Sequence, residues 1–385
     1  MKDGSNIYLD HAAATPVLEE VKAEILALLE KEPVNPSSIH NRGRKSDKIL
    51  SDARKEIADI LACKPAEILF TSGGTEANNL ALVGLANAGH PRGRHVISCS
   101  TEHPSILKSC EHLTRLGFEV SYLSVNRHGE IDLEELNTLI RKDTILISLM
   151  WVNNETGLIH PVEAIGNLAR EKAVLFHCDA TQGVGHFPLD LAHFPVDALS
   201  FSGHKLGALP GIGGLFLRKG TPLQEQSYGG SQENNLRAGT QNLPGILSLA
   251  TALRYHQNKH AELGARYTSL LQVLMEGLTA IPEIRINRGG HDYSPHILNC
   301  SIPVVDGEAL FIRLDMSGLS VSNGAACSSG SQAPSHVLTA LGLAPEAAKA
   351  SLRVSFGPQT SPDEVKTFCH RLGVTVAALK NGRPA

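Results

Sequence analysis

A lysine on a glycine-rich turn is the first residue of this sequence that could do chemistry. Lys205 lies in Ser202-Gly-His-Lys-Leu-Gly207, directly after an apolar strand-like run, and further glycines follow up to Gly214. A lysine that forms a Schiff base must lose its proton, which requires a partly desolvated site with cationic or polar neighbours. The glycines let the backbone turn tightly beside a flat ligand. Taken alone, such a lysine is more often a solvated loop residue.

A second segment, Phe70-Thr-Ser-Gly-Gly-Thr-Glu-Ala-Asn-Asn79, joins an expected strand to an expected helix. Its small residues leave backbone N–H groups free at a helix N-terminus, where an anion is favoured, and Thr75 adds a hydroxyl. The spacing is neither GxGxxG nor a Walker sequence, so it does not favour a dinucleotide or P-loop site. An ordinary helix-capping turn is the alternative interpretation.

A third segment, Phe176-His-Cys-Asp-Ala-Thr-Gln182, ends an apolar strand-like run. Asp179 could pair with a pyridinium nitrogen and hold its proton, which keeps the ring an electron sink. His177, Cys178 and Asp179 also suggest a metal site, but strand alternation points Cys178 away from the other two. The pattern therefore favours a cofactor over a metal ion.

Around these segments, short apolar runs alternate with helix-period segments, which predicts an α/β fold with a largely parallel sheet. Several runs, such as Thr144–Met150, are apolar throughout and fit strands buried on both faces. The last two runs are joined by a connection too short for a helix, so we expect them to pair antiparallel. Strands are expected over 68–71, 95–98, 120–125, 144–152, 174–179, 197–202 and 214–218. Helices are expected over 17–31, 75–88, 104–116, 133–140 and 162–171.

The alternation of apolar strand-like runs with helical segments changes after about residue 255. Two helical stretches over 257–279 are expected to lead into shorter α+β elements at 297–302, 308–316, 319–322, 335–341 and 351–356. We therefore expect a large cofactor-binding domain over 15–255. A smaller α+β domain would comprise 1–14 and 256–385, with a crevice between the two.

Composition excludes several classes of protein. The 385 residues are 42% hydrophobic, which indicates a sizeable core. The net charge of −4 does not favour binding to nucleic acid or to an anionic membrane. Seven cysteines are widely spaced without a CxxC pair, so a zinc ribbon or thioredoxin-like site is not supported. Free thiols favour a reducing compartment, and no signal peptide or membrane-spanning segment is evident. We expect a cytoplasmic protein.

Ten motifs in order along nearly the whole chain resemble the class V aminotransferase-fold family, and within it the group I NifS/IscS-type cysteine desulfurases. The resemblance implies the type I fold of the pyridoxal-phosphate (PLP) transferases, a homodimer, and PLP as cofactor. The motifs are Tyr8–Pro16, Asn35–His40, Thr71–Asn79, Thr101–Pro104, Val152–Gly157, Asp179–Gln182, Ser202–Lys205, Arg237–Thr240, Ala325–Gly330 and Arg353–Phe356.

The resemblance also implies roles for matching residues. Lys205 would carry the cofactor covalently, Asp179 would pair with the ring nitrogen, and His103 would stack on the ring and move protons. A helix-cap histidine is the alternative for His103, since Pro104 follows it. The other positions implied for the cofactor are Thr75, Glu76, Asn154, Gln182, Ser202, His204 and, from the partner subunit, Thr240.

Cys327 lies in Ser320–Pro334, a stretch rich in small residues that predicts a mobile surface loop. By contrast, Cys300 lies among Ile and Leu, so Cys327 alone has a setting that favours reactivity. The resemblance implies that its thiolate attacks the sulfur of L-cysteine, which leaves alanine and a persulfide for transfer to an acceptor protein such as an iron–sulfur scaffold. No resident metal is expected, although Cys327 could transiently share a cluster with such a scaffold.

Arg353, in a strand-like Leu-Arg-Val-Ser-Phe run, could bind the substrate carboxylate bidentately, with Asn154 beside it. A surface arginine in a salt bridge is the alternative. The chain departs from the usual family pattern at Ala208–Pro210, Asn234–Asn235 and Ala348–Ala350, none of which has an assigned chemical role. Rival functions are a selenocysteine lyase, a class V aminotransferase and a PLP-free sulfur-transfer scaffold.

Overall fold

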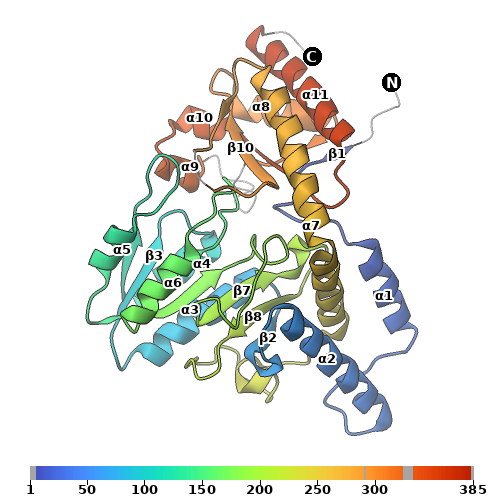
Figure 1. The fold of residues 1–385 in the computed structure, drawn as a ribbon, viewed down its shortest axis with the longest axis vertical. Coiled ribbons are helices and arrows are strands. Elements are labelled where there is room, and N and C mark those ends of the chain that lie inside the picture. Colours follow the sequence, from blue (N-terminus) through green and yellow to red (C-terminus); the bar gives the residue numbers. More distant parts are fainter. Residues whose placement is uncertain (1–5, 290–291, 324–332, 383–385) are drawn as a thin grey trace.

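The computed structural model describes residues 6–289, 292–323 and 333–382, which form two lobes joined by one long helix (Figure 1). The helix, α7 (Leu243–Thr279), contributes to both hydrophobic cores. Its first half packs with the large sheet through residues such as Leu249, and its second half packs with the smaller lobe through residues such as Leu270. The expected boundary at residue 255 falls inside α7, and the domain division itself stays a prediction.

The large lobe is built on a seven-stranded sheet with the order β2-β8-β7-β6-β5-β3-β4. Neighbours from β7 to β4 pair in parallel, whereas β8 is antiparallel to both β2 and β7. The prediction of a mostly parallel sheet with an antiparallel last pair is confirmed. The strands are β2 (Ile68–Thr71), β3 (His95–Cys99), β4 (Glu119–Leu123), β5 (Thr144–Met150), β6 (Leu175–Asp179), β7 (Ala198–Ser202) and β8 (Gly213–Leu217).

The strand directions decide where the chemistry lies. Because β2 is antiparallel to β8, and β8 to β7, β2 runs in the same direction as β7 and the other parallel strands. The carboxyl ends of β2, β3, β5, β6 and β7 therefore meet at one edge of the sheet. In open α/β sheets this edge is where ligands bind.

Helices cover this sheet and complete the lobe. They are α1 (Glu19–Leu29), α2 (Asn41–Ile60), α3 (Gly74–Gly89), α4 (Pro104–Arg115), α5 (Leu133–Leu139) and α6 (Val162–Glu171). Short 3-10 turns follow at η1 (Pro65–Glu67), η2 (Gly203–Lys205) and η3 (Glu233–Asn235).

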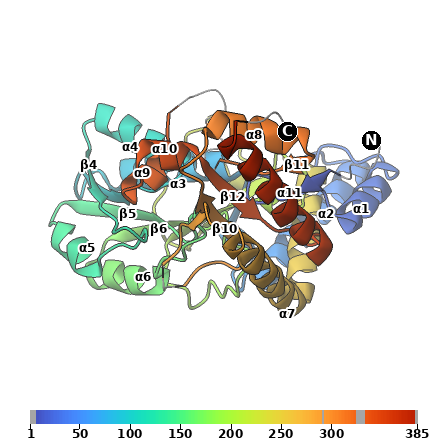
Figure 2. The same ribbon diagram turned by 90° about the horizontal axis from the view of Figure 1, so that it is seen from above.

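The smaller lobe combines a three-stranded antiparallel sheet with helices on both sides. Its strand order is β12-β10-β9, and β1 pairs with β11 in a separate ribbon. In Figures 1 and 2, α9 and α10 lie on one side of this sheet and α11 on the other. The elements are β1 (Ile7–Tyr8), β9 (Arg285–Ile286), β10 (Ile297–Ser301), α8 (Gly307–Met316), β11 (Leu319–Ser320), α9 (His336–Ala340), α10 (Pro345–Lys349), β12 (Ser351–Ser355) and α11 (Pro362–Lys380).

Four α-helices differ from the sequence expectation. One continuous helix, α7, starts at Leu243, where two stretches from residue 257 were expected. Helices α2, α10 and α11 were not predicted at all. The buried face of α2, which packs against α7, includes Gly43, Ser46, Leu50, Ala53 and Ile57 at helical spacing, but only Leu50 and Ile57 are large apolar residues, so the sequence signal is weak.

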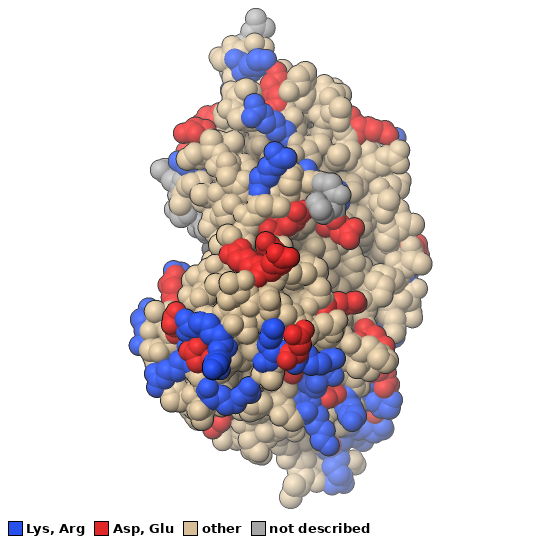
Figure 3. Space-filling view, turned by 60° about the vertical axis from the view of Figure 1, so that its left-hand side comes forward, with Lys and Arg blue, Asp and Glu red and all other residues tan. Residues whose placement is uncertain are grey.

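Within the described part of the chain, no helix combines the length and apolar character needed to cross a membrane. Figure 3 shows lysines and arginines gathered in the lower half of one face, with Asp and Glu side chains between them. The charge of that region is therefore mixed.

A group of three histidines, of which His256 and His296 are buried and His186 is partly buried, lies where the lobes meet. The rings of His186 and His296 stack with centroids 3.8 Å apart and planes 12° from parallel, and His256 meets His186 edge-on at 5.5 Å. These residues come from the loop after β6, from α7 and from the segment before β10. Burial lowers the pKa of His256 to about 4 and that of His296 to about 3. Desolvation also lowers the pKa of His186 well below its usual value, so all three rings are neutral in the folded protein at pH 7.

We predict that this histidine group makes the protein acid-labile. The unfolded chain binds protons below its histidine pKa of about 6.5, but the folded chain does so only near pH 3–4, so stability is complete above pH 7 and falls as the pH drops below 6.5. For His296 the loss between pH 7.5 and pH 5 is roughly 2 kcal/mol. Urea unfolding at both pH values measures it. His296→Asn should be less stable than the wild type at pH 7.5 yet lose less on acidification; an equal loss in both would contradict the prediction.

Candidate active site

A cavity of about 500 Å³ opens at the carboxyl edge of the large sheet. Its lining brings together segments that follow β2, β3, β5, β6 and β7, together with one residue of β12. Only two of the residues predicted for the site are absent from this lining. Thr240 lies on an exposed loop outside the cavity, and Cys327 lies outside the described residues. The predicted residues that do line the cavity are Thr75, Glu76, His103, Asn154, Asp179, Gln182, Ser202, His204, Lys205 and Arg353.

Lys205 ends the 3-10 turn η2 directly after β7, with its ammonium group held by the N-terminal segment. Nζ donates to the carbonyl oxygens of Ala12 and Ala13, each at 2.7 Å. Nε2 of Gln182 donates to the same Ala12 oxygen at 2.9 Å. The motif near residue 10, which the sequence left without a role, therefore orients the lysine.

Asp179, at the end of β6, is 6% exposed and held by two donors. Oδ2 accepts from Asn78 Nδ2 at 2.7 Å, and Oδ1 accepts from the backbone N–H of Thr181 at 3.0 Å. Each carboxylate oxygen has a further lone pair, so the group can still accept from a ring N–H. Sequence reasoning quoted Asn78 within a motif but missed its contact with Asp179, since 101 residues separate the two.

His103 both caps α4 and lines the cavity, so the two interpretations of this residue are compatible. Its Nδ1 accepts from the backbone N–H of Ser105 at 3.1 Å and lies 2.8 Å from Ser105 Oγ. That hydroxyl also accepts from Asn78 Nδ2 at 2.9 Å, which links His103 to Asp179 through side chains. Burial lowers the pKa of His103, and nearby Lys205 adds to this effect.

The turn between β2 and α3 lines the cavity with small residues and backbone groups at the start of a helix. Gly73 has φ +155°, and a Cβ there would come within 3.7 Å of Ser202 Oγ. Ser202 Oγ in turn lies 2.8 Å from Nδ1 of His204. The buried Thr181 Oγ1 has no hydrogen-bond partner among the described residues. These side chains and the backbone N–H groups at the start of α3 border the open space of the cavity. Such hydrogen-bonding groups at a helix N-terminus suit an anion.

Arg353, on β12, is only 1% exposed, so it is not the surface arginine of the alternative interpretation. Nη2 donates to Asp10 Oδ1 at 2.7 Å, and Nη1 donates to the backbone oxygen of Asn154 at 2.9 Å. Nε is buried without a partner in the described part of the chain. A donor is thus left for a carboxylate, because an unpaired buried N–H is costly.

Two further residues at the cavity were missed by sequence reasoning. His336, on α9, lines the cavity and places Nε2 2.9 Å from the backbone oxygen of Glu102. Glu155, which also lines it, accepts from Ser335 Oγ. Both contacts tie the small lobe to the large one. No single motif could reveal them, because they join residues about 180 or more positions apart.

The metal alternative at residues 177–179 finds no geometric support. Both ring nitrogens of His177 lie 2.9 Å from serine hydroxyls, of Ser148 and Ser200, on the neighbouring strands. Cys178 belongs to the hydrophobic core, as strand alternation predicted. Among the described residues, no group of three or more His, Cys, Asp or Glu side chains is placed to hold a metal ion.

The cavity fits pyridoxal phosphate. Its volume lies within the range of small-molecule sites. Its lining offers the start of α3, the Ser202 and Thr181 side chains, the Asp179 carboxylate and the Lys205 amine. These are groups that suit a phosphate, a ring nitrogen and an aldehyde.

Comparisons with known proteins agree with this arrangement. The sequence pattern of the aminotransferase class-V family matches residues 7–368. The chain is 41% identical over 363 residues to cysteine desulfurase IscS of Dictyoglomus turgidum, covering 93% of this chain and 91% of that protein. It is 39% identical over 378 residues to the IscS of Methanosarcina thermophila, covering 98% and 94%.

Solved structures give the same result. A NifS-like protein superposes with a TM-score of 0.91 at 33% identity, covering 97% of this chain and all of that one. The structure of SspA in complex with cysteine superposes with a TM-score of 0.81 at 33% identity, covering 92% and 99%.

We predict that Asn78→Leu weakens cofactor binding roughly tenfold or more, because a hydrogen bond to a charged group contributes about 1.5–3 kcal/mol. Absorbance titration of the cofactor-free protein with pyridoxal phosphate measures the dissociation constant. Asn79→Leu is the matched control, since the Asn79 amide donates to the Thr75 carbonyl of its own helix. Equal affinities for the Asn78 variant and the wild type would contradict the role of Asn78.

Proposed function

This chain belongs to the aminotransferase class-V family and, within it, to the PLP-dependent cysteine desulfurases, and on this premise we propose which of its residues do the chemistry. The observation that carries the proposal is that motifs scattered from Ala12 to Arg353 line one cavity.

We assign the cofactor as follows. Thr75, Ser202 and His204 hold its phosphate, Asp179 accepts from its ring nitrogen, and Lys205 carries it covalently. Glu76, Asn154, Gln182 and His103 complete the surroundings. When bound, the cofactor withdraws electrons from bonds around the α-carbon of the amino acid substrate.

The protein's own groups handle the substrate and its protons. Arg353, with one unpaired N–H, binds the carboxylate of L-cysteine beside Asn154. His103 is neutral at pH 7 because burial lowers its pKa, so its imidazole can accept a proton from the substrate. Its link through Ser105 fixes which nitrogen faces the cavity.

The sulfur is proposed to pass to Cys327. The net change converts L-cysteine and the Cys327 thiol into L-alanine and a Cys327 persulfide, so atoms and electrons balance without a further oxidant. Burial raises the pKa of every described cysteine, to about 12 for Cys63, Cys110 and Cys300 and about 11 for Cys369. The thiolate is the attacking form, so these six are poor nucleophiles at neutral pH.

Three finer proposals concern partners and location. We propose a homodimer in which Thr240 serves the partner's phosphate, because Thr240 is exposed outside its own chain's cavity. The sulfur would go to an acceptor protein such as an iron–sulfur scaffold. A reducing compartment, the cytoplasm, suits the six described cysteines, all of which are free.

Cys327→Ala is predicted to bind the cofactor but to form no alanine from cysteine, because the attacking thiolate is gone. Alanine release and bound-cofactor absorbance are measured on the same preparation. Cys63→Ala removes the most accessible described cysteine and should keep full activity. Sustained alanine formation by Cys327→Ala would overturn the assignment of Cys327 as the residue that accepts the sulfur, and it would favour the aminotransferase alternative. Alanine release from selenocysteine is then compared with alanine release from cysteine. Release from selenocysteine alone would favour the selenocysteine lyase over the cysteine desulfurase.

Arg353→Lys is predicted to raise the KM for cysteine roughly tenfold or more while leaving cofactor content unchanged, because lysine lacks the planar guanidinium fork. Steady-state kinetics with cysteine measure this. Arg371→Lys is the control, since Arg371 donates to the backbone oxygen of Ser317 on the small lobe. An unchanged KM would remove Arg353 from substrate binding.

A further inference from the structure

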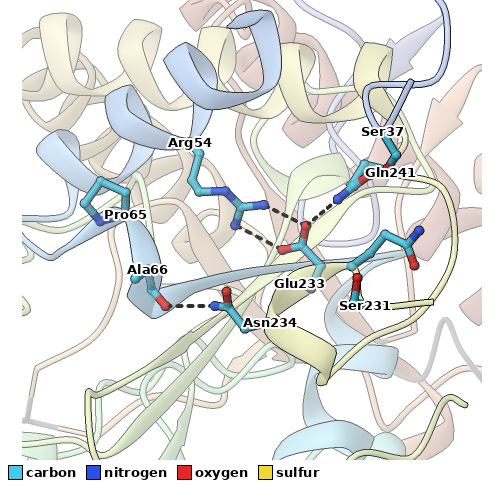
Figure 4. Close-up of a pocket in the computed structure, with 9 residues that line it drawn as sticks. Ser37, Arg54, Pro65, Ala66, Ser231, Glu233, Asn234 and Gln241 are labelled. Atoms are coloured by element: carbon cyan, nitrogen blue, oxygen red, sulfur yellow. Dashed lines mark hydrogen bonds and ion pairs between the residues drawn. The ribbon is translucent and has the colours of Figure 1, made fainter. Parts of the chain in front are cut away.

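Two ion pairs fasten the loop of residues 231–241 to its surroundings, one to helix α2 and one to the first turn of α3 beside the proposed phosphate site. The first joins Arg54 of α2 to Glu233, whose side chain is 1% exposed (Figure 4). Arg54 Nη2 and Nη1 donate to Glu233 Oε1 and Oε2 at 2.6 and 3.0 Å. Glu233 Oε2 also accepts from the backbone N–H of Phe70 on β2, at 3.0 Å. The loop is thereby attached one residue before the turn's first threonine, Thr71.

The backbone at this attachment point is unusual. Glu233, Asn234 and Asn235 have φ values of 46°, 58° and 64°, so three consecutive non-glycine residues lie in the left-handed region. Such conformations cost free energy and persist only where the surroundings hold them. The pair between partly buried Arg54 and buried Glu233 provides that hold, and Figure 4 shows Asn234 directed to the Ala66 carbonyl.

The second ion pair lies after the turn. Arg237 Nε and Nη2 donate to Glu76 Oε1 and Oε2 at 2.7 and 3.2 Å, and Glu76 Oε2 also accepts from the backbone N–H of Ser72 at 2.7 Å. Burial acts to raise the pKa of Glu76, but the hydrogen bonds from Arg237 and Ser72 outweigh it and hold the pKa below its usual range. Glu76 is therefore a carboxylate that lines the cavity.

The position of Glu76 creates an electrostatic conflict. A carboxylate in the first turn of α3 occupies the same positive helix end that attracts a phosphate. Two anions near each other repel, and the repulsion is stronger where water is partly excluded. The guanidinium of Arg237 cancels the charge of Glu76 at this point.

We propose that Arg237 is a positioning residue for the cofactor phosphate: it neutralises Glu76 at the start of α3, and the Arg54–Glu233 pair fixes the loop that presents Arg237. The inference rests on the proposed assignment of the phosphate to this turn. Because Arg237 pairs with Glu76, a carboxylate can lie next to the phosphate without repelling it.

The test compares two ligands on cofactor-free protein: pyridoxal phosphate, and pyridoxal, which lacks the phosphate. Arg237→Gln should raise the dissociation constant for pyridoxal phosphate on the order of tenfold, because Glu76 then repels the phosphate. Binding of pyridoxal should change by less than about twofold. Arg54→Gln should show the same phosphate-specific loss, and Arg237→Lys, which keeps the charge, should lose less than Arg237→Gln.

The double variant Glu76→Gln/Arg237→Gln decides whether charge is the cause. Its dissociation constant for pyridoxal phosphate should lie within about threefold of the wild-type value. The double change removes both the Glu76 carboxylate that repels the phosphate and the Arg237 guanidinium that neutralises it. The control is Arg141→Gln, which breaks a bidentate pair with Glu119 on the exposed surface and should change neither constant.

Three results would overturn the proposal: equal losses for both ligands in Arg237→Gln, no loss at all, or a double variant as weak as Arg237→Gln. An unaffected Arg54→Gln would overturn the role of the Arg54–Glu233 pair. A wild type that shows no preference for pyridoxal phosphate over pyridoxal would instead count against the phosphate assignment itself, so the two failures are distinguishable.

Discussion

The common direction of β2, β3, β5, β6 and β7 is the constraint on which the rest of the structure depends. Parallel strands bring their carboxyl ends to one edge. The glycine-containing turn after β2, a histidine, an acid and a lysine that follow different strands therefore line one cavity. The two antiparallel pairings of β8 are essential here, because two reversals restore the direction of β2 and place its turn beside Ser202.

Charged groups at this edge are held in pairs or hydrogen-bond networks. Asp179 accepts from Asn78 and Thr181, Lys205 donates to two backbone carbonyls, and Arg353 pairs with Asp10. A buried charge without partners would be strongly destabilising. The partners also orient the charged atoms, so the contacts that satisfy the buried groups prepare the cavity for its ligand.

The site depends on both lobes. Arg353 comes from β12, but its guanidinium reaches the Asn154 carbonyl beyond β5, and Ser335 and His336 bind the large lobe from the start of α9. Helix α7 runs through both cores, so the lobes are joined along a continuous element rather than by a flexible linker. The neutral histidines at the same junction connect its stability to pH.

Residue types and their local order determined much about this protein. Apolar runs predicted the seven strands of the large sheet, and the motifs predicted the cofactor and ten residues that the structure brings to one cavity. They did not reveal α2, whose buried face has only two large apolar residues among small and polar ones, nor the continuity of α7, whose periodicity is masked where it is buried on several sides. Only tertiary structure decided that Asn78 holds Asp179, that Ala12 and Ala13 hold Lys205, and that Arg237 neutralises Glu76. The physical reason is that these contacts join residues about 100 to 200 positions apart, and such pairings arise from strand order and packing rather than from local sequence.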